Sequence, residues 1–187
     1  MTNSSLFRGM KRIAPIFLLL ITLAISVFAQ KAAVTKSKIT FEIKNLGIKS
    51  TGTIGGVQAN VQFVPANLAA SSIEATADVN TINTDNDERD THLKSADFFD
   101  LAHYPKITMK SISFKKKSGN NYVGQFNVTI RNKTKQLEVP FSYVENGNTA
   151  TLIGVVKLNR LDFGVGDSSL VLSNDVTVNI EVEVSKS

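Results

Sequence analysis

The sequence has no cysteine and no tryptophan, and it has only three tyrosines and two histidines among its 187 residues. Without cysteine the chain can form no disulfide and carry no lipid-modified cysteine. Two histidines without cysteine cannot supply three nitrogen or sulfur ligands, so we expect no metal site. No Gly-x-Ser-x-Gly elbow, phosphate-binding loop or dinucleotide fingerprint occurs, so we expect no cofactor and favour a binding protein over an enzyme.

The first 29 residues have the pattern of a secretory signal peptide. Arg8, Lys11 and Arg12 precede an apolar run over residues 16–28. A basic segment, an apolar segment of about 7–15 residues and a small residue before the cut are the features that the export machinery recognises. A membrane anchor is the alternative, but a spanning helix needs about 20 apolar residues. We therefore predict cleavage after Ala29 and a periplasmic or secreted protein with no stable membrane anchor.

The charge of the chain indicates no nucleic-acid partner. The formal net charge of +5 includes three basic residues of the predicted signal peptide and falls to +2 without them. The one basic cluster, residues 115–117, stands beside Gly119 and Asn120, where a hairpin loop is expected. A solvated loop explains this cluster better than a nucleic-acid surface does.

Residues 30–187 are expected to form one all-β domain, because apolar residues alternate with polar ones almost throughout. The alternation changes phase near Ser111, which predicts a β-bulge there. The eight candidate strands follow apolar positions at residues 39–43, 57–63, 73–79, 107–114, 122–130, 137–143, 150–158 and 176–184.

One polar segment interrupts the alternation and predicts a short helix near residues 86–96. Asp85 or Asn86 can cap its amino terminus, and acidic residues crowd its first turn. Lys94 lies near the other end, where the helix dipole favours a cation.

The strand pattern predicts an eight-stranded antiparallel barrel, and its aromatic content indicates which face is apolar. A membrane barrel would place girdles of Trp, Tyr and Phe at both interfaces. This chain has no Trp and three Tyr. We therefore expect a soluble barrel with its apolar residues inside.

A barrel of eight strands can be filled by its own side chains or can hold one small ligand. Small residues on the inward phase would leave room, namely Ala59, Ala75, Ala77, Gly124, Ala150 and Gly154. Ordinary interdigitation of small and large residues explains them equally well, so the pattern alone leaves both alternatives open. If a tunnel exists, we expect its lining to include Phe41, Phe63, Ala75, Ala77, Met109, Phe126, Phe141, Leu152 and, as a polar handle, Tyr143.

Arg89, Asp90 and His92 form the one cluster that could perform chemistry, with His92 as a general base beside carboxylates. The structural alternative is that Arg89 pairs with Asp90 or Asp162 and that His92 bonds backbone carbonyls. These contacts would fix the helix across one end of the barrel. We favour the structural alternative, because charges near a surface often fix loops.

Residues 81–105 carry a specific family resemblance, through Thr-Ile-Asn-Thr, Arg-Asp-Thr-His-Leu-Lys-Ser-Ala-Asp-Phe-Phe-Asp and Tyr-Pro. Further similarity appears at residues 37–47, 128–135 and 159–164. Over about residues 37–184 the sequence resembles the YceI-like family of polyisoprenoid-binding proteins. This resemblance implies a lipocalin-like periplasmic barrel with a long isoprenoid or similar lipid threaded through it.

Three hypotheses on function follow. The leading one is a module that carries or stores a polyisoprenoid, an isoprenoid quinone or a fatty-acid derivative. The second is an enzyme that acts on such a lipid through Arg89, Asp90 and His92. The third is a filled barrel that acts in a stress-related assembly. An unpaired strand edge or an exposed Phe could also support a homodimer.

Overall fold

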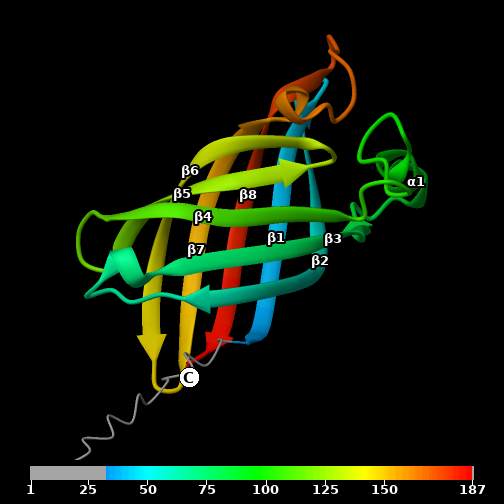
Figure 1. Ribbon diagram of the computed structural model, residues 1–187. Coiled ribbons are helices and arrows are strands. Elements are labelled where there is room, and N and C mark those ends of the chain that lie inside the picture. The colour runs from blue at the N-terminus through cyan, green and yellow to red at the C-terminus, as the bar shows by residue number, and fades with distance from the viewer. Residues whose placement is uncertain (1–32, 187) are drawn as a thin grey trace, which may run out of the picture.

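The computed structural model describes residues 33–186, and these form a closed antiparallel barrel (Figure 1). Each strand pairs with the next in the chain, and the last pairs with the first, which confirms the predicted fold. The expected signal peptide lies outside the described residues. The strands are β1 (Val34–Asn45), β2 (Ile48–Gln62), β3 (Ser72–Asn83), β4 (Lys106–Lys116), β5 (Asn121–Ile130), β6 (Lys133–Asn146), β7 (Thr149–Asn159) and β8 (Leu172–Ser185).

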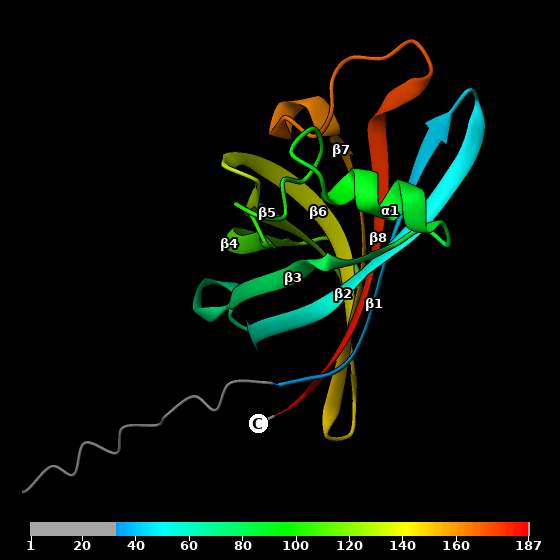
Figure 2. The same cartoon turned by 90° about the vertical axis from the view of Figure 1, so that its right-hand side faces the viewer.

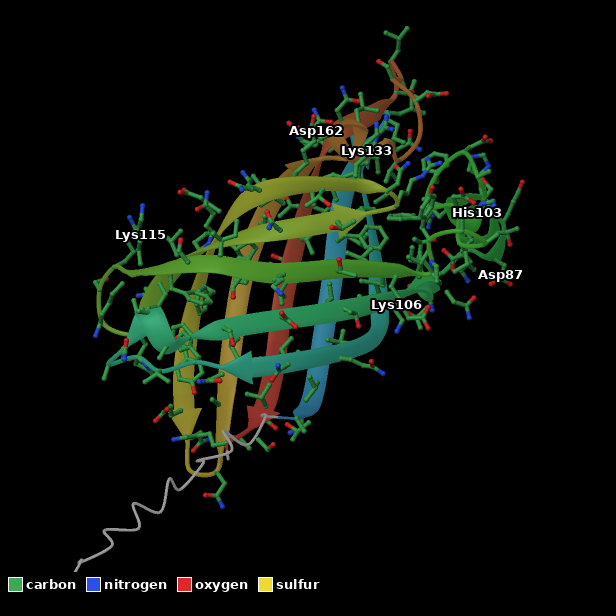
Figure 3. The ribbon with its side chains drawn as sticks, in the orientation of Figure 1. Asp87, His103, Lys106, Lys115, Lys133 and Asp162 are labelled. Atoms are coloured by element: carbon green, nitrogen blue, oxygen red, sulfur yellow. The ribbon has the colours of Figure 1, made fainter. Side chains whose placement is uncertain are left out.

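The apolar phase of each strand faces the interior of the barrel. Strand β5 is a clear example, since every second residue from Tyr122 to Ile130 is buried while the residues that alternate with them are partly exposed. Charged side chains such as Lys106 and Lys115 are exposed and lie outside the barrel wall (Figure 3). The alternation therefore arises from a wall that separates an apolar interior from water.

Strand β2 begins nine residues earlier than the apolar pattern predicts, at Ile48 instead of Val57. Glycines dilute the pattern in this part of the strand. Gly56 has φ of +62° and coincides with a shift in the register between β2 and β3. A glycine bulge of this kind changes which residues face inward, so a simple period of two fails across it.

The bulge predicted near Ser111 is confirmed. The pairing of β4 with β5 shifts register between Ser111 and Ser113. The hydroxyl of Ser111 accepts a hydrogen bond from the backbone N–H of Ile73 at 2.9 Å. The side chain thus satisfies a donor at the point where the strand ladder is interrupted.

The predicted helix is present as α1 (Asp87–Lys94), and two short 3-10 helices, η1 (Leu68–Ala70) and η2 (Arg160–Phe163), accompany it. Asn86 caps α1, because its side-chain oxygen accepts from the Arg89 backbone N–H at 2.8 Å. The helix ends earlier than residue 96, where the Ser95 N–H bonds to the carbonyl of His92. None of its residues is buried, and Figure 2 shows it lying across one end of the barrel.

Candidate ligand cavity

The barrel encloses an apolar cavity of about 620 Å³, lined by residues from all eight strands. Four of the small inward-facing residues line it, namely Ala59, Ala75, Ala77 and Gly154. Two others lie outside this lining. Ala150 is fully buried in the core, and the face of Gly124 is covered by the Phe126 ring. The small residues therefore create space over part of the interior and admit packed rings elsewhere.

Seven of the nine residues expected to line a tunnel do line the cavity: Phe41, Ala75, Ala77, Met109, Phe126, Phe141 and Leu152. Phe63 and Tyr143 do not, and their expected place is corrected. Both are buried beyond the end of the cavity, in the cluster that closes the barrel. Strand β8 contributes further lining that we did not single out, Val178 and Ile180 among it.

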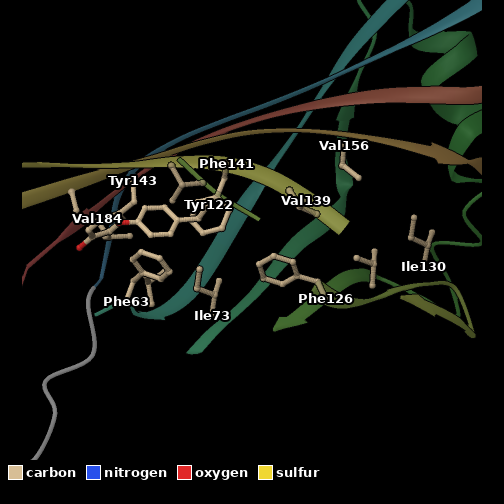
Figure 4. Packing of buried hydrophobic residues seen from close by; sticks show 14 of the residues in the cluster. Phe63, Ile73, Tyr122, Phe126, Ile130, Val139, Phe141, Tyr143, Val156 and Val184 are labelled. Atoms are coloured by element: carbon tan, nitrogen blue, oxygen red, sulfur yellow. The ribbon is translucent and has the colours of Figure 1, made fainter. Parts of the chain in front are cut away.

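Aromatic rings close the end of the barrel opposite α1 (Figure 4). Phe63 lies at their centre, with its ring centroid 4.9 Å from Tyr122, 5.3 Å from Phe114 and 5.5 Å from Phe141, each with the rings close to perpendicular. Edge-to-face pairs at such distances stabilise a fold beyond the area that they bury. We call Phe63, Phe114, Tyr122 and Tyr143 the aromatic plug; the cavity ends at it.

Within the described residues, the hydroxyl of Tyr143 is the only one in the aromatic plug that bonds to a charged group. Its hydroxyl donates to Glu145 at 3.4 Å. Burial, together with the negative charge of Glu145, raises the pKa of Tyr143 to about 12. A hydrogen bond from Lys186 lowers the pKa of Glu145. The phenol is thus held neutral and fixed in place, which suits a structural group better than a ligand handle.

The opposite end of the cavity is its mouth, which is lined by polar as well as apolar groups. Helix α1 and its cap contribute several of these residues, and they are Asn86, Glu88, Arg89, His92 and Leu93. The helix therefore covers the mouth with a surface that combines charged groups and one leucine. A ligand with an apolar tail and a polar end would fit this gradient.

Arg89 and Asp90, two of the three residues in the cluster predicted near the mouth, hold the buried Thr84 in place. Asp90 accepts hydrogen bonds from the backbone N–H of Thr84 at 2.9 Å and from its hydroxyl. Arg89 donates to the same hydroxyl at 2.7 Å and to the carbonyl of Thr84 at 2.6 Å. The expectation that Arg89 pairs with Asp90 or Asp162 is therefore wrong in its partner, although the cluster does fix α1 to the end of β3.

His92 packs against an aromatic ring. Its centroid lies 4.9 Å from that of Phe98, with the rings at 66°. The expected bonds to backbone carbonyls are replaced by this contact, and the His92 ring is exposed at the mouth. Asp162 lies apart, on η2 (Figure 3).

Arg160 lines the cavity near the mouth and is only 3% exposed. Its guanidinium donates to the backbone carbonyls of Ser173 at 3.0 Å, Val165 at 2.8 Å and Asp167 at 2.7 Å. Burial lowers its pKa, and the charge of Asp167 partly offsets this effect. The side chain thus holds together the segment between η2 and β8. Sequence reasoning missed this role, and its single signal was the position of Arg160 within the family-like residues 159–164.

Within residues 33–186, no group of three or more His, Cys, Asp or Glu side chains is placed to hold a metal ion. In the same range, no helix is long and apolar enough to cross a membrane.

Residues 31–184 match the model of the YceI-like domain. The chain belongs to the YceI-like family. A UPF0312 protein of Vibrio cholerae is 28% identical to it over 155 residues, covering 78% of this chain and 80% of that protein. Among solved structures, BcnA of Burkholderia cenocepacia superimposes with a TM-score of 0.75 at 26% identity, covering 79% of this chain and 95% of that one.

A second structural neighbour is described as a polyisoprenoid-binding domain from Saccharophagus degradans, implicated in plant cell wall breakdown. It superimposes with a TM-score of 0.67 and covers 85% of this chain and 99% of that one. At 13% identity, this likeness shows a shared YceI-like barrel and nothing finer.

Proposed function

We propose that this YceI-like protein binds one long apolar lipid in its cavity and carries or stores it outside the cytoplasm. The observation that supports this most strongly is a cavity of about 620 Å³ whose walls are mostly aliphatic or aromatic and whose far end is closed. A polyisoprenoid, an isoprenoid quinone and a fatty-acid derivative all have the required chemistry. The neighbour described as polyisoprenoid-binding supports the first of these.

The free-energy cost of association sets a lower limit on the length of the ligand. Each buried methylene contributes about 0.8 kcal/mol, so ten contribute about 8 kcal/mol, within the range of about 4–15 kcal/mol that association costs. Shorter chains should therefore bind weakly.

The arrangement of the two ends predicts the orientation of the lipid. The aromatic plug leaves the tail no exit beyond Phe126 and Phe141, while polar groups gather at the mouth beneath α1. Burial of a polar head at the closed end would leave it without hydrogen-bond partners. We therefore expect the tail to point toward the plug and the head to lie at the mouth.

The proposed location outside the cytoplasm is supported by the basic and apolar pattern of residues 1–29. Intact mass measurement of the protein from the exported fraction of its host tests this. A mass that corresponds to a chain beginning at Gln30 is expected, whereas an uncut chain in the cytoplasm would contradict the proposal.

Native mass spectrometry of the protein from its own host tests ligand binding. We expect a copurifying apolar molecule that is lost in Ala75→Phe, because the added ring would occupy the cavity. Lys157→Phe adds the same ring at an exposed position on β7 and should retain the molecule. An empty wild-type protein that also takes up no added long-chain lipid would contradict the proposal and favour an assembly role.

A comparison of His92→Ala with the wild-type protein separates a carrier from an enzyme. His92 is exposed at the mouth, so its loss should leave the bound molecule chemically unchanged. Accumulation of an unprocessed lipid in the variant would instead support the enzyme hypothesis.

A further inference from the structure

Two loop tips beside the mouth expose aliphatic side chains to water. Leu46 in the turn between β1 and β2 is 71% exposed, and Ile48 at the start of β2 is 72% exposed. The loop before β8 carries the fully exposed Leu170 and the adjacent Val171. The backbone N–H of Leu46 donates to the carbonyl of Val171 at 2.8 Å, so the tips lie side by side. Figures 1 and 2 show both projecting from the same end of the barrel.

The exposed tips are continuous with the lining of the cavity. Asn45 and Leu172 both line it, and they directly adjoin Leu46 and Val171 in the chain. An apolar molecule that left the mouth on this side would therefore meet aliphatic side chains before it met bulk water.

Leu46 occupies a backbone conformation that leucine disfavours. Its φ is +51° and that of Gly47 is +77°, so both central residues of this two-residue turn have positive φ. Turns of this kind favour Asn-Gly, and a bulky residue with positive φ is a strained exception. Because the Leu46 side chain is mostly exposed, packing within the chain offsets little of this strain. Strain of this kind at an exposed site points to a role outside the fold.

We infer that the two tips dock the protein on a lipid bilayer, so that its ligand passes between the bilayer and the cavity. This inference rests on the proposed function. A stable protein interface needs roughly 20–30 residues on each side, far more than these projecting tips present. A bilayer instead admits a few aliphatic side chains at the boundary between head groups and acyl chains.

The charges around the tips are compatible with a bilayer surface. Lys44 is exposed and lies against the loop before β8, and Lys49 is exposed and pairs with Glu42 at 2.8 Å. Asp167 on the same loop is also exposed, so the surface is mixed in sign. Insertion of the aliphatic side chains should therefore dominate, and anionic lipid should add a smaller contribution.

Vesicle flotation tests the inference, with phosphatidylcholine vesicles alone and mixed with phosphatidylglycerol. The docking variant is Leu46→Asn with Leu170→Ser, in which the introduced asparagine also suits the turn and protects folding. We expect its vesicle affinity to fall at least about tenfold, since two leucines no longer leave water. The matched control, Val144→Ser with Ile153→Ser, removes two exposed aliphatic residues from the outer wall and should bind like the wild-type protein.

All variants are prepared identically, with their amino termini matched by intact mass, and each is also assayed with a fluorescent long-chain lipid in solution. Loss of vesicle binding in the docking variant alone supports the inference. Wild-type protein that does not float, equal loss in the control, or tips that mediate self-association without vesicles would overturn it. Failure of the solution assay with the wild-type protein would instead count against the carrier proposal, and flotation would still report on docking.

Discussion

Gly124 and Phe126 lie two residues apart on β5, and the Phe126 ring covers the face of Gly124 so closely that a Cβ there would lie 2.3 Å from Cε2 of the ring. The ring can approach the backbone this closely only because residue 124 is a glycine and has no Cβ. The ring would have to move, and Phe114, 3.2 Å from the same point, leaves it little room. Gly124→Ala should therefore lower the free energy of unfolding by about 1–3 kcal/mol.

Urea unfolding of Gly124→Ala and of Gly147→Asn measures this effect. Gly147 has open space around its Cβ position and φ of +57°, which asparagine tolerates. The control should therefore remain close to the wild-type protein. Equal stability of all three proteins would show that the rings at the end of the cavity move freely.

Arg160→Met should destabilise the protein by about 3 kcal/mol, because one buried and two partly buried carbonyls lose a charged donor. Arg160→Lys keeps the charge but not the planar fork, so an intermediate loss is expected. Urea unfolding measures the loss of stability, and the rate of proteolysis between η2 and β8 measures how far that segment loosens. Lys157→Met, on the outer wall, should change stability by no more than about 0.5 kcal/mol.

Thr84→Val should loosen α1 from the barrel, because the hydroxyl that joins Arg89 to Asp90 is lost. The expected cost is about 1–2 kcal/mol, seen as faster hydrogen exchange at the Asp90 amide, which bonds to the carbonyl of Asn86. Thr84→Ser retains the hydroxyl and should exchange like the wild-type protein. Unchanged exchange in Thr84→Val would show that the backbone bonds alone hold the helix.

The raised pKa of Tyr143 predicts a loss of stability at high pH. Its pKa is raised from 10 to about 12 in the folded protein, chiefly by burial. Between these values the unfolded chain releases the proton while the folded chain retains it, so the free energy of unfolding falls as the pH rises. The stabilisation is complete below pH 10 and is lost as the pH rises through about 12.

The difference in unfolding free energy between the wild-type protein and Tyr143→Phe isolates this group from the other tyrosines and the lysines. The decline above pH 10 should be less steep in Tyr143→Phe. Parallel curves for the two proteins would mean that the phenol titrates equally in both states.

Local chemistry was sufficient to predict α1 and the bulge at Ser111. A cap depends on residues within one turn of the helix, as Asn86 and Arg89 show. A bulge shifts the phase of its own strand, so it is visible without the partner strand. The start of β2 was missed because its glycines carry no side chain to mark a face.

The partners at the mouth could not be predicted in the same way. Arg89 stands next to Asp90 in the chain, yet both side chains turn to Thr84, which charge pairing alone does not suggest. The burial of Arg160 likewise depends on carbonyls from the segment before β8, which a linear pattern cannot place around it.

Except across the glycine bulge of β2, the sequence by itself determined which side chains point inward, because alternation along a strand sets the face of a sheet for each residue. The tertiary structure decided how far along the barrel axis each inward residue lies. Phe41 and Phe63 both point into the barrel, yet Phe41 lines the cavity and Phe63 closes its end. Axial position follows from the stagger of eight paired strands, a property of the closed sheet that no single strand contains.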